Sequence, residues 1–87
     1  MKNIKLCVVG GGNWGKNHIR TLYEFGCLGG IVDTSHMILE DLKTLYEDCI
    51  FLSNLEESFE ENFDGYIVAT PPKTHFELAK KIIERKK

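Results

Sequence analysis

Four short apolar runs, separated by segments of helical periodicity, constrain the fold of this chain more than any other sequence feature. The runs are rich in strand-forming residues and occupy 4–9, 28–32, 49–52 and 65–69. Apolar residues recur at helical spacing after the first, second and fourth runs, and a capping box with a short acidic segment follows the third, so each strand is predicted to lead into a helix. Strands joined through helices cannot be hairpins and lie parallel. With right-handed crossovers, the sequence predicts an α/β fold with a doubly wound parallel sheet of four strands in the order 3-2-1-4.

Local signals predict where the helices begin and end. The first helix is predicted over 13–25, with Gly26 as the left-handed residue that follows it. The second apolar stripe extends over 38–46. A hydroxyl three residues before a glutamate is typical of a capping box, and it predicts N-caps at Ser53 and Thr74 for the last two helices.

Length and composition exclude several classes of protein. The chain has 87 residues and a net charge of −2, which fits one domain and argues against a nucleic-acid binder. It has no apolar run of the ~20 residues that a membrane span needs. The first apolar run is too short for a signal peptide, so a cytoplasmic location is predicted. The three cysteines are scattered, and we expect them to be reduced and buried.

The segment Val-Val-Gly-Gly-Gly-Asn-Trp-Gly at 8–15 is the strongest local signal. Gly10, Gly12 and Gly15 fit the pattern G-x-G-x-x-G between the first strand and the first helix. The first glycine permits a tight turn, the second lets the backbone approach a pyrophosphate, and the third lets the helix pack against the strand. The pattern therefore predicts a Rossmann-like dinucleotide-binding turn, and a glycine turn without a ligand is the alternative.

Asp33 ends the second predicted strand, 18 residues after Gly15. A carboxylate at this place accepts hydrogen bonds from the adenosine ribose hydroxyls and repels a 2′-phosphate. Thr34 and Ser35 follow, and no arginine stands beside Asp33 to receive that phosphate. NAD is therefore favoured over NADP as the cofactor. An aspartate here also suits capping of the next helix, and the two roles are compatible.

The segment 69–75, Ala-Thr-Pro-Pro-Lys-Thr-His, follows the fourth strand. In the order 3-2-1-4 it faces the nicotinamide half of a dinucleotide, because ligands bind at the switch point beyond the strand ends. His75 either supports this loop or cofactor, or packs locally, and it lacks the carboxylate partner of a catalytic base. No catalytic or metal-binding residue is predicted, since His18 and His36 have no evident partner and the glutamates of 56–61 suit a solvated helix face.

The chain resembles the glucose–fructose oxidoreductase/inositol dehydrogenase/MocA family over nearly its whole length. The resemblance rests on Val-Val-Gly-Gly-Gly-Asn-Trp-Gly-Lys-Asn-His at 8–18, on Asp33, and on Ala-Thr-Pro-Pro-Lys-Thr-His-Phe-Glu-Leu-Ala at 69–79. It implies an oxidoreductase that passes a hydride between NAD(P) and an alcohol carbon of a sugar or cyclitol. The variant Trp-Gly-Lys-Asn is similar to members that act on nucleotide-linked sugars.

The resemblance also implies roles for individual residues. Asp33 matches the ligand of the adenosine ribose, and Ser53 and Asn54 lie where family members approach the adenine. The residues that match the pyrophosphate loop are Gly10, Gly12, Asn13, Trp14 and Gly15. The residues that match the loop beside the nicotinamide ribose are Thr70, Pro71 and His75.

The family pattern continues beyond this sequence. Members carry a Glu-Lys-Pro motif on the next strand, with its lysine near the reacting carbon, and then a substrate domain, whereas this chain ends at Lys87. Residues 1–87 are therefore expected to form a partial NAD(P)-binding domain without a second domain, a fragment or truncated product that binds NAD but does not catalyse alone. The alternatives are a stand-alone NAD-binding regulatory module and a truncated remnant that binds nothing.

The fourth predicted strand has no neighbour on one side. Tyr66, Ile67 and Val68 would then stand on an exposed edge, and such edges invite pairing with another chain. We therefore expect a homo-oligomer. The other predicted partners are NAD and, for a full-length protein only, a sugar-type substrate.

Overall fold

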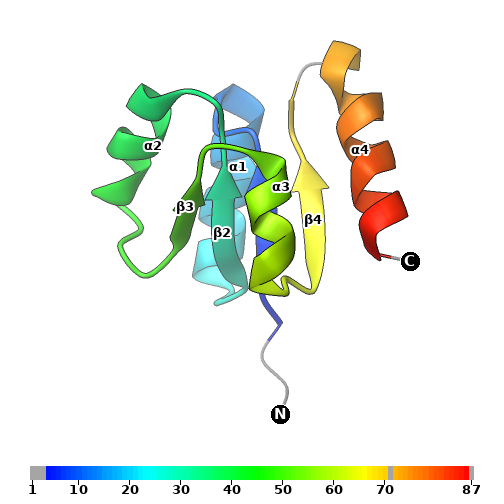
Figure 1. Cartoon of the computed structure of the whole chain (residues 1–87). Helices are drawn as coiled ribbons and strands as arrows, with labels where there is room; N and C mark the ends of the chain where they lie inside the picture. The colour runs from blue at the N-terminus through cyan, green and yellow to red at the C-terminus, as the bar shows by residue number, and fades with distance from the viewer. Residues whose placement is uncertain (1–3, 71, 87) are drawn as a thin grey trace.

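The computed structural model has four parallel strands in one sheet, in the predicted order β3-β2-β1-β4 (Figure 1). It describes residues 4–70 and 72–86, apart from six side chains, those of Asn13, Trp14, Pro72, Lys73, His75 and Lys86. The strands are β1 (Leu6–Val9), β2 (Leu28–Val32), β3 (Ile50–Leu52) and β4 (Gly65–Val68). The helices are α1 (Asn13–Glu24), α2 (His36–Lys43), α3 (Leu55–Ser58), the 3-10 helix η1 (Phe59–Glu61) and α4 (Pro72–Lys86).

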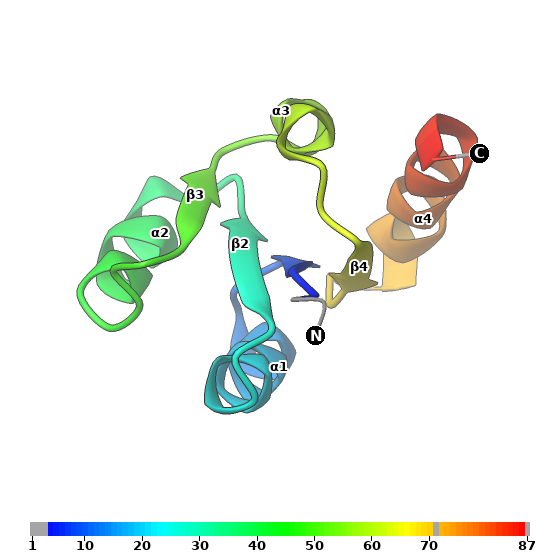
Figure 2. The same cartoon turned by 90° about the horizontal axis from the view of Figure 1, so that it is seen from below.

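Helices cover both faces of the sheet, which confirms the doubly wound architecture (Figure 2). Along β1, Val8 points into the core beneath α1 and α2, whereas Cys7 and Val9 point into the core beneath α3 and α4. This alternation follows from the period of two in a strand. Because β1 is buried on both faces, its apolar run is continuous in the sequence.

The carboxyl ends of the strands lie at one edge of the sheet. Val9 is in register with Val32 of β2 and Val68 of β4. Backbone hydrogen bonds continue past the strand ends, because the Gly10 N–H donates to the Val32 carbonyl at 2.7 Å and the Ala69 N–H donates to the Val9 carbonyl at 2.8 Å. The loops that carry the sequence motifs are therefore brought together at this edge.

The predicted end of the second helix is wrong. α2 ends at Lys43 instead of reaching residue 46, because the chain turns there and the Leu42 carbonyl accepts from the N–H groups of both Leu45 and Tyr46. The Tyr46 ring instead packs edge-on against Tyr23 of α1, with the ring centroids 4.8 Å apart. Tyr46 therefore continues the apolar stripe of the sequence because its ring packs against α1, although the residue lies beyond the end of α2.

Both predicted capping boxes are also wrong. The N-cap of α3 is Asn54, one residue after Ser53, and its side-chain oxygen accepts from the Glu57 N–H at 2.9 Å. α4 begins at Pro72, so Thr74 lies inside its first turn. Proline suits the first helical position because the N–H that it lacks has no helical partner there. The prediction for Gly26 is confirmed, since it follows α1 with a φ of +75°.

Glycines in β2 make room for an aromatic ring from another segment. A Cβ on Gly30 would overlap the ring of Phe63, which lies between η1 and β4 and is only 4% exposed. Phe63 in turn packs edge-on against Tyr66 of β4. Gly29 and Gly30, which interrupt the apolar run of β2 in the sequence, therefore leave room for the Phe63 ring on the α3 side of the sheet. No helix within residues 4–70 and 72–86 has the length and apolar character needed to cross a membrane.

The three cysteines are free, but they differ in burial. Cys7 is 0% exposed, whereas Cys27 and Cys49 are partly exposed, so the prediction of buried thiols is confirmed for Cys7 only. Burial raises the pKa of the Cys7 thiol to about 12. Burial, followed by the nearby Asp48 carboxylate, also raises the pKa of Cys49.

We expect Cys7 to resist alkylation in the folded protein. At pH 8 its thiol is protonated and shielded, and only a thiolate reacts readily with iodoacetamide. Intact-mass spectrometry should show Cys27 and Cys49 modified well before a third adduct forms. The control is the same reaction in guanidinium chloride, where all three sites should react together. A folded sample that gains its third adduct at the rate of the first two would contradict this burial.

Candidate dinucleotide-binding site

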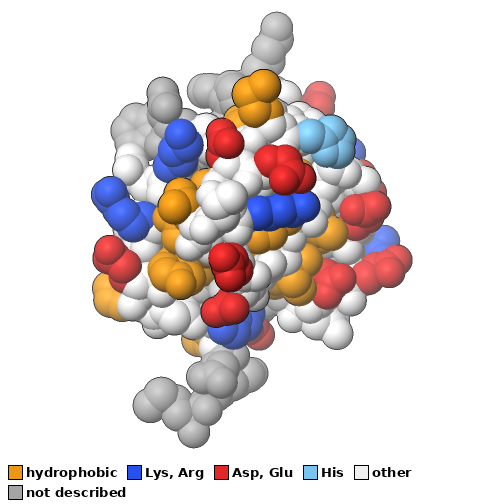
Figure 3. Space-filling view, turned by 90° about the vertical axis from the view of Figure 1, so that its left-hand side faces the viewer, with side chains coloured by type: hydrophobic (Ala, Val, Ile, Leu, Met, Phe, Trp, Pro, Cys, Tyr) orange, Lys and Arg blue, Asp and Glu red, His pale blue; other side chains and the backbone are white. Residues whose placement is uncertain are grey.

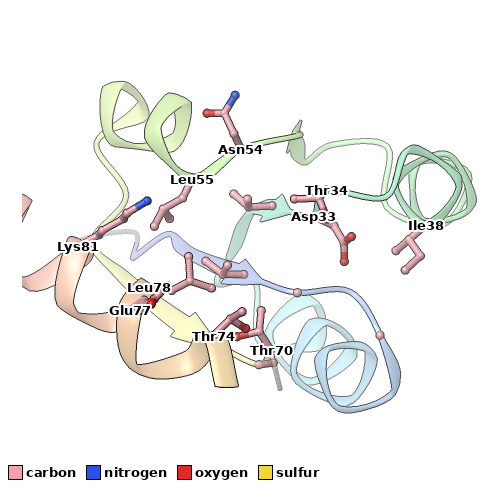
Figure 4. A pocket seen from close by; sticks show the side chains of 15 residues that line it. Asp33, Thr34, Ile38, Asn54, Leu55, Thr70, Thr74, Glu77, Leu78 and Lys81 are labelled. Carbon is pink, nitrogen blue, oxygen red and sulfur yellow. The ribbon is translucent and has the colours of Figure 1, made fainter. Parts of the chain in front are cut away.

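A cleft of about 770 Å³ lies at the carboxyl ends of the strands (Figure 4). Its walls are the glycine turn after β1, the end of β2, the beginning of α3, the end of β4 and one side of α4. Leu55 of α3 and Leu78 of α4 point into it from opposite sides. Its volume lies within the ~300–1,000 Å³ that is typical of ligand pockets.

The turn after β1 depends on two glycines for its shape. Gly10 has a φ of +104°, which favours glycine, and a Cβ on Gly15 would overlap the Gly10 carbonyl oxygen. Gly12, which also lines the cleft, has open space around the position of a Cβ. It is the N-cap of α1 and supplies no side-chain cap. The first N–H groups of a helix have no helical partner, so this turn can present them to an anion.

Asp33 connects the end of β2 to this turn. One carboxylate oxygen accepts from the Gly11 N–H at 2.7 Å, and the other accepts from the Ser35 N–H at 2.8 Å. The N-cap of α2 is Ser35, whose hydroxyl accepts from the Ile38 N–H at 3.4 Å, so Asp33 orders the residue before the helix instead of capping it. Each carboxylate oxygen has a further lone pair for a ligand hydroxyl.

The contact between Gly11 and Asp33 has no counterpart in the sequence prediction. Gly11 occupies a variable position of the motif, yet a Cβ there would lie 2.8 Å from a methyl carbon of Ile38 in α2. The only sequence signal was the run of three glycines, which exceeds what the pattern requires. Gly11 therefore serves the approach of α2 and Asp33 to the turn.

Thr70 follows β4 and lines the cleft, as predicted for this loop. Its side-chain oxygen is buried and has no hydrogen-bond partner within the part of the chain that the structure describes. A buried hydroxyl that lacks a partner costs free energy, so a ligand group that pairs with it is favoured. The loop also touches the glycine turn, because a Cβ on Gly10 would lie 3.1 Å from the Thr70 methyl carbon.

The other predicted site residues are placed to different extents. Ser53 does not line the cleft, whereas its neighbour Asn54 does. Pro71 lies outside the described residues, as do the side chains of Asn13, Trp14 and His75. The structure thus brings together the glycine turn, Asp33, Asn54 and Thr70.

The wall supplied by α4 was not predicted. Thr74, Leu78 and Lys81 recur at helical spacing and line the cleft together, and this spacing was the available signal. Lys81 forms an ion pair with Glu56 of α3 at 3.1 Å, across the cleft between the two helices. A hydrogen bond from its own backbone, followed by the Lys81 ammonium, lowers the pKa of the Glu56 carboxyl.

The two described histidines and the acidic segment are in contact with solvent, and Glu77 of α4 also lines the cleft. His18, His36 and the four glutamates between positions 56 and 61 are exposed, which confirms the solvated face predicted for the acidic segment. Across residues 4–70 and 72–86, no three histidine, cysteine, aspartate or glutamate side chains come together as a metal-ligand set. The polar atoms of the cleft are suited to a ligand with hydroxyls and negative charge.

Comparison with known proteins points to the same kind of ligand. Residues 4–87 match the family model GFO_IDH_MocA, described as an oxidoreductase family with an NAD-binding Rossmann fold. No curated protein matches the chain.

Two solved structures share the fold. GenD2 from gentamicin A biosynthesis, in complex with NAD, is 27% identical with a TM-score of 0.88, over 98% of this chain and 25% of that one. The WlbA dehydrogenase from Bordetella pertussis, in complex with NADH and UDP-GlcNAcA, is 25% identical with a TM-score of 0.89, over 100% of this chain and 27% of that one. The chain spans about a quarter of the length of each. Because the family model covers residues 4–87, the resemblance seen in the sequence is confirmed, and the chain belongs to the glucose–fructose oxidoreductase/inositol dehydrogenase/MocA family as an NAD-binding Rossmann domain.

Proposed function

We propose that the cleft binds NAD with its pyrophosphate on the first turn of α1 and its adenosine ribose on Asp33. The observation that carries this proposal is the fixed position of the Asp33 carboxylate, which two backbone N–H groups hold at 2.7 and 2.8 Å beside the glycine turn. An acceptor held in this way suits a vicinal pair of ribose hydroxyls. The open space at Gly12 lets a phosphate approach the backbone.

The rest of the dinucleotide then extends to both sides of the turn. We place the adenine near Ser53 and Asn54, because Asn54 lines the cleft beyond Asp33. The nicotinamide ribose lies on the segment from Thr70 to His75, where the Thr70 hydroxyl gains a partner. The side chains of Asn13 and Trp14 complete the pyrophosphate loop in this proposal. When bound, NAD supplies a nicotinamide ring that accepts or donates a hydride.

For the whole protein we propose an NAD-dependent oxidoreductase that acts on an alcohol carbon of a sugar, a nucleotide-linked sugar or a cyclitol. The family supports the oxidoreductase class, and the complex of the WlbA dehydrogenase with UDP-GlcNAcA favours a nucleotide-linked sugar. In this proposal the chain contributes cofactor binding. A cytoplasmic location and a homo-oligomeric state are further parts of it, and the free thiols of the described cysteines favour a reducing compartment.

Calorimetric titration of the 87-residue chain with NAD and with NADP tests the cofactor proposal. We expect NAD to bind with a dissociation constant in the micromolar to millimolar range, and NADP to bind at least about tenfold more weakly, because the Asp33 carboxylate repels a 2′-phosphate. Equal affinities would contradict the role of Asp33. Absence of heat with either nucleotide, up to about 10 mM, would favour a remnant that binds nothing.

A further inference from the structure

The part of the cleft between α3 and α4 is lined by apolar side chains. Leu55 of α3 and Leu78 of α4 point into it from opposite sides, and both pack on the core of this face of the sheet (Figure 4). Val32, which is only 3% exposed, also lines it and is followed directly by Asp33. Flat aromatic rings bind well between apolar side chains. This part of the cleft therefore suits a nucleotide base whose ribose lies on Asp33.

Two charged side chains of α4 border the same part of the cleft. Glu77 and Lys81 are one helical turn apart, so they lie on the same side of the helix, and both line the cleft. Figure 4 shows them beside Leu78, at the end of the cleft opposite Ile38. A carboxylate, which only accepts hydrogen bonds, thus lies near an ammonium, which only donates them.

The Lys81 ammonium is directed across the cleft by its ion pair with Glu56 of α3 at 3.1 Å. An ammonium has three N–H donors, so this contact leaves donors for a ligand. On the face of the molecule formed by α2, acidic and basic side chains are interspersed (Figure 3), and Lys43 of α2 pairs with Glu40 of the same helix at 3.5 Å. Neither of these two residues lines the cleft. The Lys81 pair, by contrast, joins two helices across a space that can hold a ligand.

A carboxylate beside an ammonium matches the edge of adenine. The N6 amino group of adenine donates hydrogen bonds, and the ring nitrogens on either side of it, N1 and N7, accept them. Hypoxanthine and guanine instead carry a carbonyl oxygen at position 6, which a carboxylate repels. A site that offers a carboxylate and an ammonium to this edge therefore favours adenine.

We propose that the Glu77 carboxylate accepts a hydrogen bond from the adenine N6 amino group, and that the Lys81 ammonium donates one to the neighbouring ring nitrogen. The α4 wall then selects adenine dinucleotides over those with a 6-oxopurine base. This inference rests on the proposed binding of NAD and extends it to the recognition of the base. Both side chains are exposed, so water competes for them, and we expect a preference of about tenfold.

Calorimetric titration of the chain with NAD and with nicotinamide hypoxanthine dinucleotide tests the inference. The two ligands share both riboses and the pyrophosphate, so Asp33 and the glycine turn do not distinguish them. We expect NAD to bind about tenfold more tightly. Equal affinities would overturn the inference and leave the proposed binding of NAD intact. Absence of binding by both ligands would overturn the proposed function, and this inference with it.

Substitutions on α4 show which side chain is responsible. Glu77→Gln places an amide at the base edge, and an amide can donate to a carbonyl oxygen as well as accept from an amino group. The preference for NAD should therefore fall to within about twofold. Lys81→Met keeps an unbranched side chain without the donors and should weaken NAD binding about fivefold.

Glu40→Gln is the matched control, because it removes the same charge from an exposed helical glutamate outside the cleft and should preserve the preference. Circular dichroism checks that all three variants are folded. A preference for NAD that survives Glu77→Gln would overturn the inference, as would an NAD affinity that Lys81→Met leaves unchanged. A preference that is lost in Glu40→Gln as well would also overturn it, because net charge would then be responsible.

Discussion

The substitution Gly15→Ala is expected to lower the free energy of unfolding by about 2–3 kcal/mol, because it adds a methyl group where the glycine turn leaves no space for one. The added Cβ would overlap the Gly10 carbonyl oxygen. Both groups belong to the backbone, so no change of rotamer relieves the contact. Gly10 is itself held in place, because its N–H donates to the Val32 carbonyl at 2.7 Å. α1 must therefore move away from the sheet and loosen the packing of Ile19, which is 0% exposed.

Thermal unfolding followed by circular dichroism measures this effect. For a domain of this size, the loss corresponds to a fall in the melting temperature of about 10–20 °C. Gly12→Ala is the matched control, because nothing lies within 4 Å of the added Cβ. It should melt close to the unsubstituted chain and yet bind NAD more weakly, since the methyl group enters the path of the pyrophosphate. A Gly15→Ala chain that melts like the Gly12→Ala chain would contradict the close approach of α1 to the turn.

The second large effect is expected for Asp33→Ala. This change removes the acceptor of the Gly11 and Ser35 N–H groups and the proposed acceptor of the ribose hydroxyls. Hydrogen bonds to a charged group contribute about 1.5–3 kcal/mol each, and Asp33 is only half-buried, so we expect the free energy of unfolding to fall by about 2 kcal/mol. NAD affinity is expected to fall at least about 100-fold. Urea unfolding and calorimetric titration measure the two effects separately.

Two further variants isolate the charge from the hydrogen bonds. Asp33→Asn keeps one acceptor oxygen and removes the negative charge, so it should reduce the preference for NAD over NADP while keeping more stability than Asp33→Ala. Asp41→Ala removes an exposed carboxylate from α2, outside the cleft, and should leave both affinities unchanged. If Asp41→Ala weakened NAD binding as much as Asp33→Ala, the effect would be one of net charge and the assigned role of Asp33 would be wrong.

The sequence predicted the sheet and the glycine turn because their signals lie within short segments of the chain. The run that became β1 is apolar at every buried position, and the motif after it demands glycine where the backbone closes on itself. The ends of the helices were harder to predict. Ser53 and Asn54 are both good caps, and each has a glutamate three residues later. In the folded chain Asn54 is the cap, because its side-chain oxygen accepts from the Glu57 N–H.

Helical spacing places Thr74, Leu78 and Lys81 on one side of α4, but only the tertiary structure shows what that side faces. Leu78 faces the cleft only after α4 has packed beside α3, and the ion pair between Lys81 and Glu56 joins residues 25 positions apart. The buried Thr70 hydroxyl is a similar case, because its lack of a partner becomes visible only when the surrounding atoms are placed. These residues could be predicted as helical or loop residues, but not as neighbours.

The two backbone N–H groups held by Asp33 limit how the cofactor preference of such a domain can be changed. A substitution that admits a 2′-phosphate must remove the carboxylate, and it thereby leaves the Gly11 and Ser35 amides without their acceptor. A route toward NADP therefore passes through a less stable protein unless the replacement side chain, or the arriving phosphate, restores a hydrogen bond to those amides. Selection for a new cofactor at this position is at the same time selection for a new way to fasten β2 to the glycine turn.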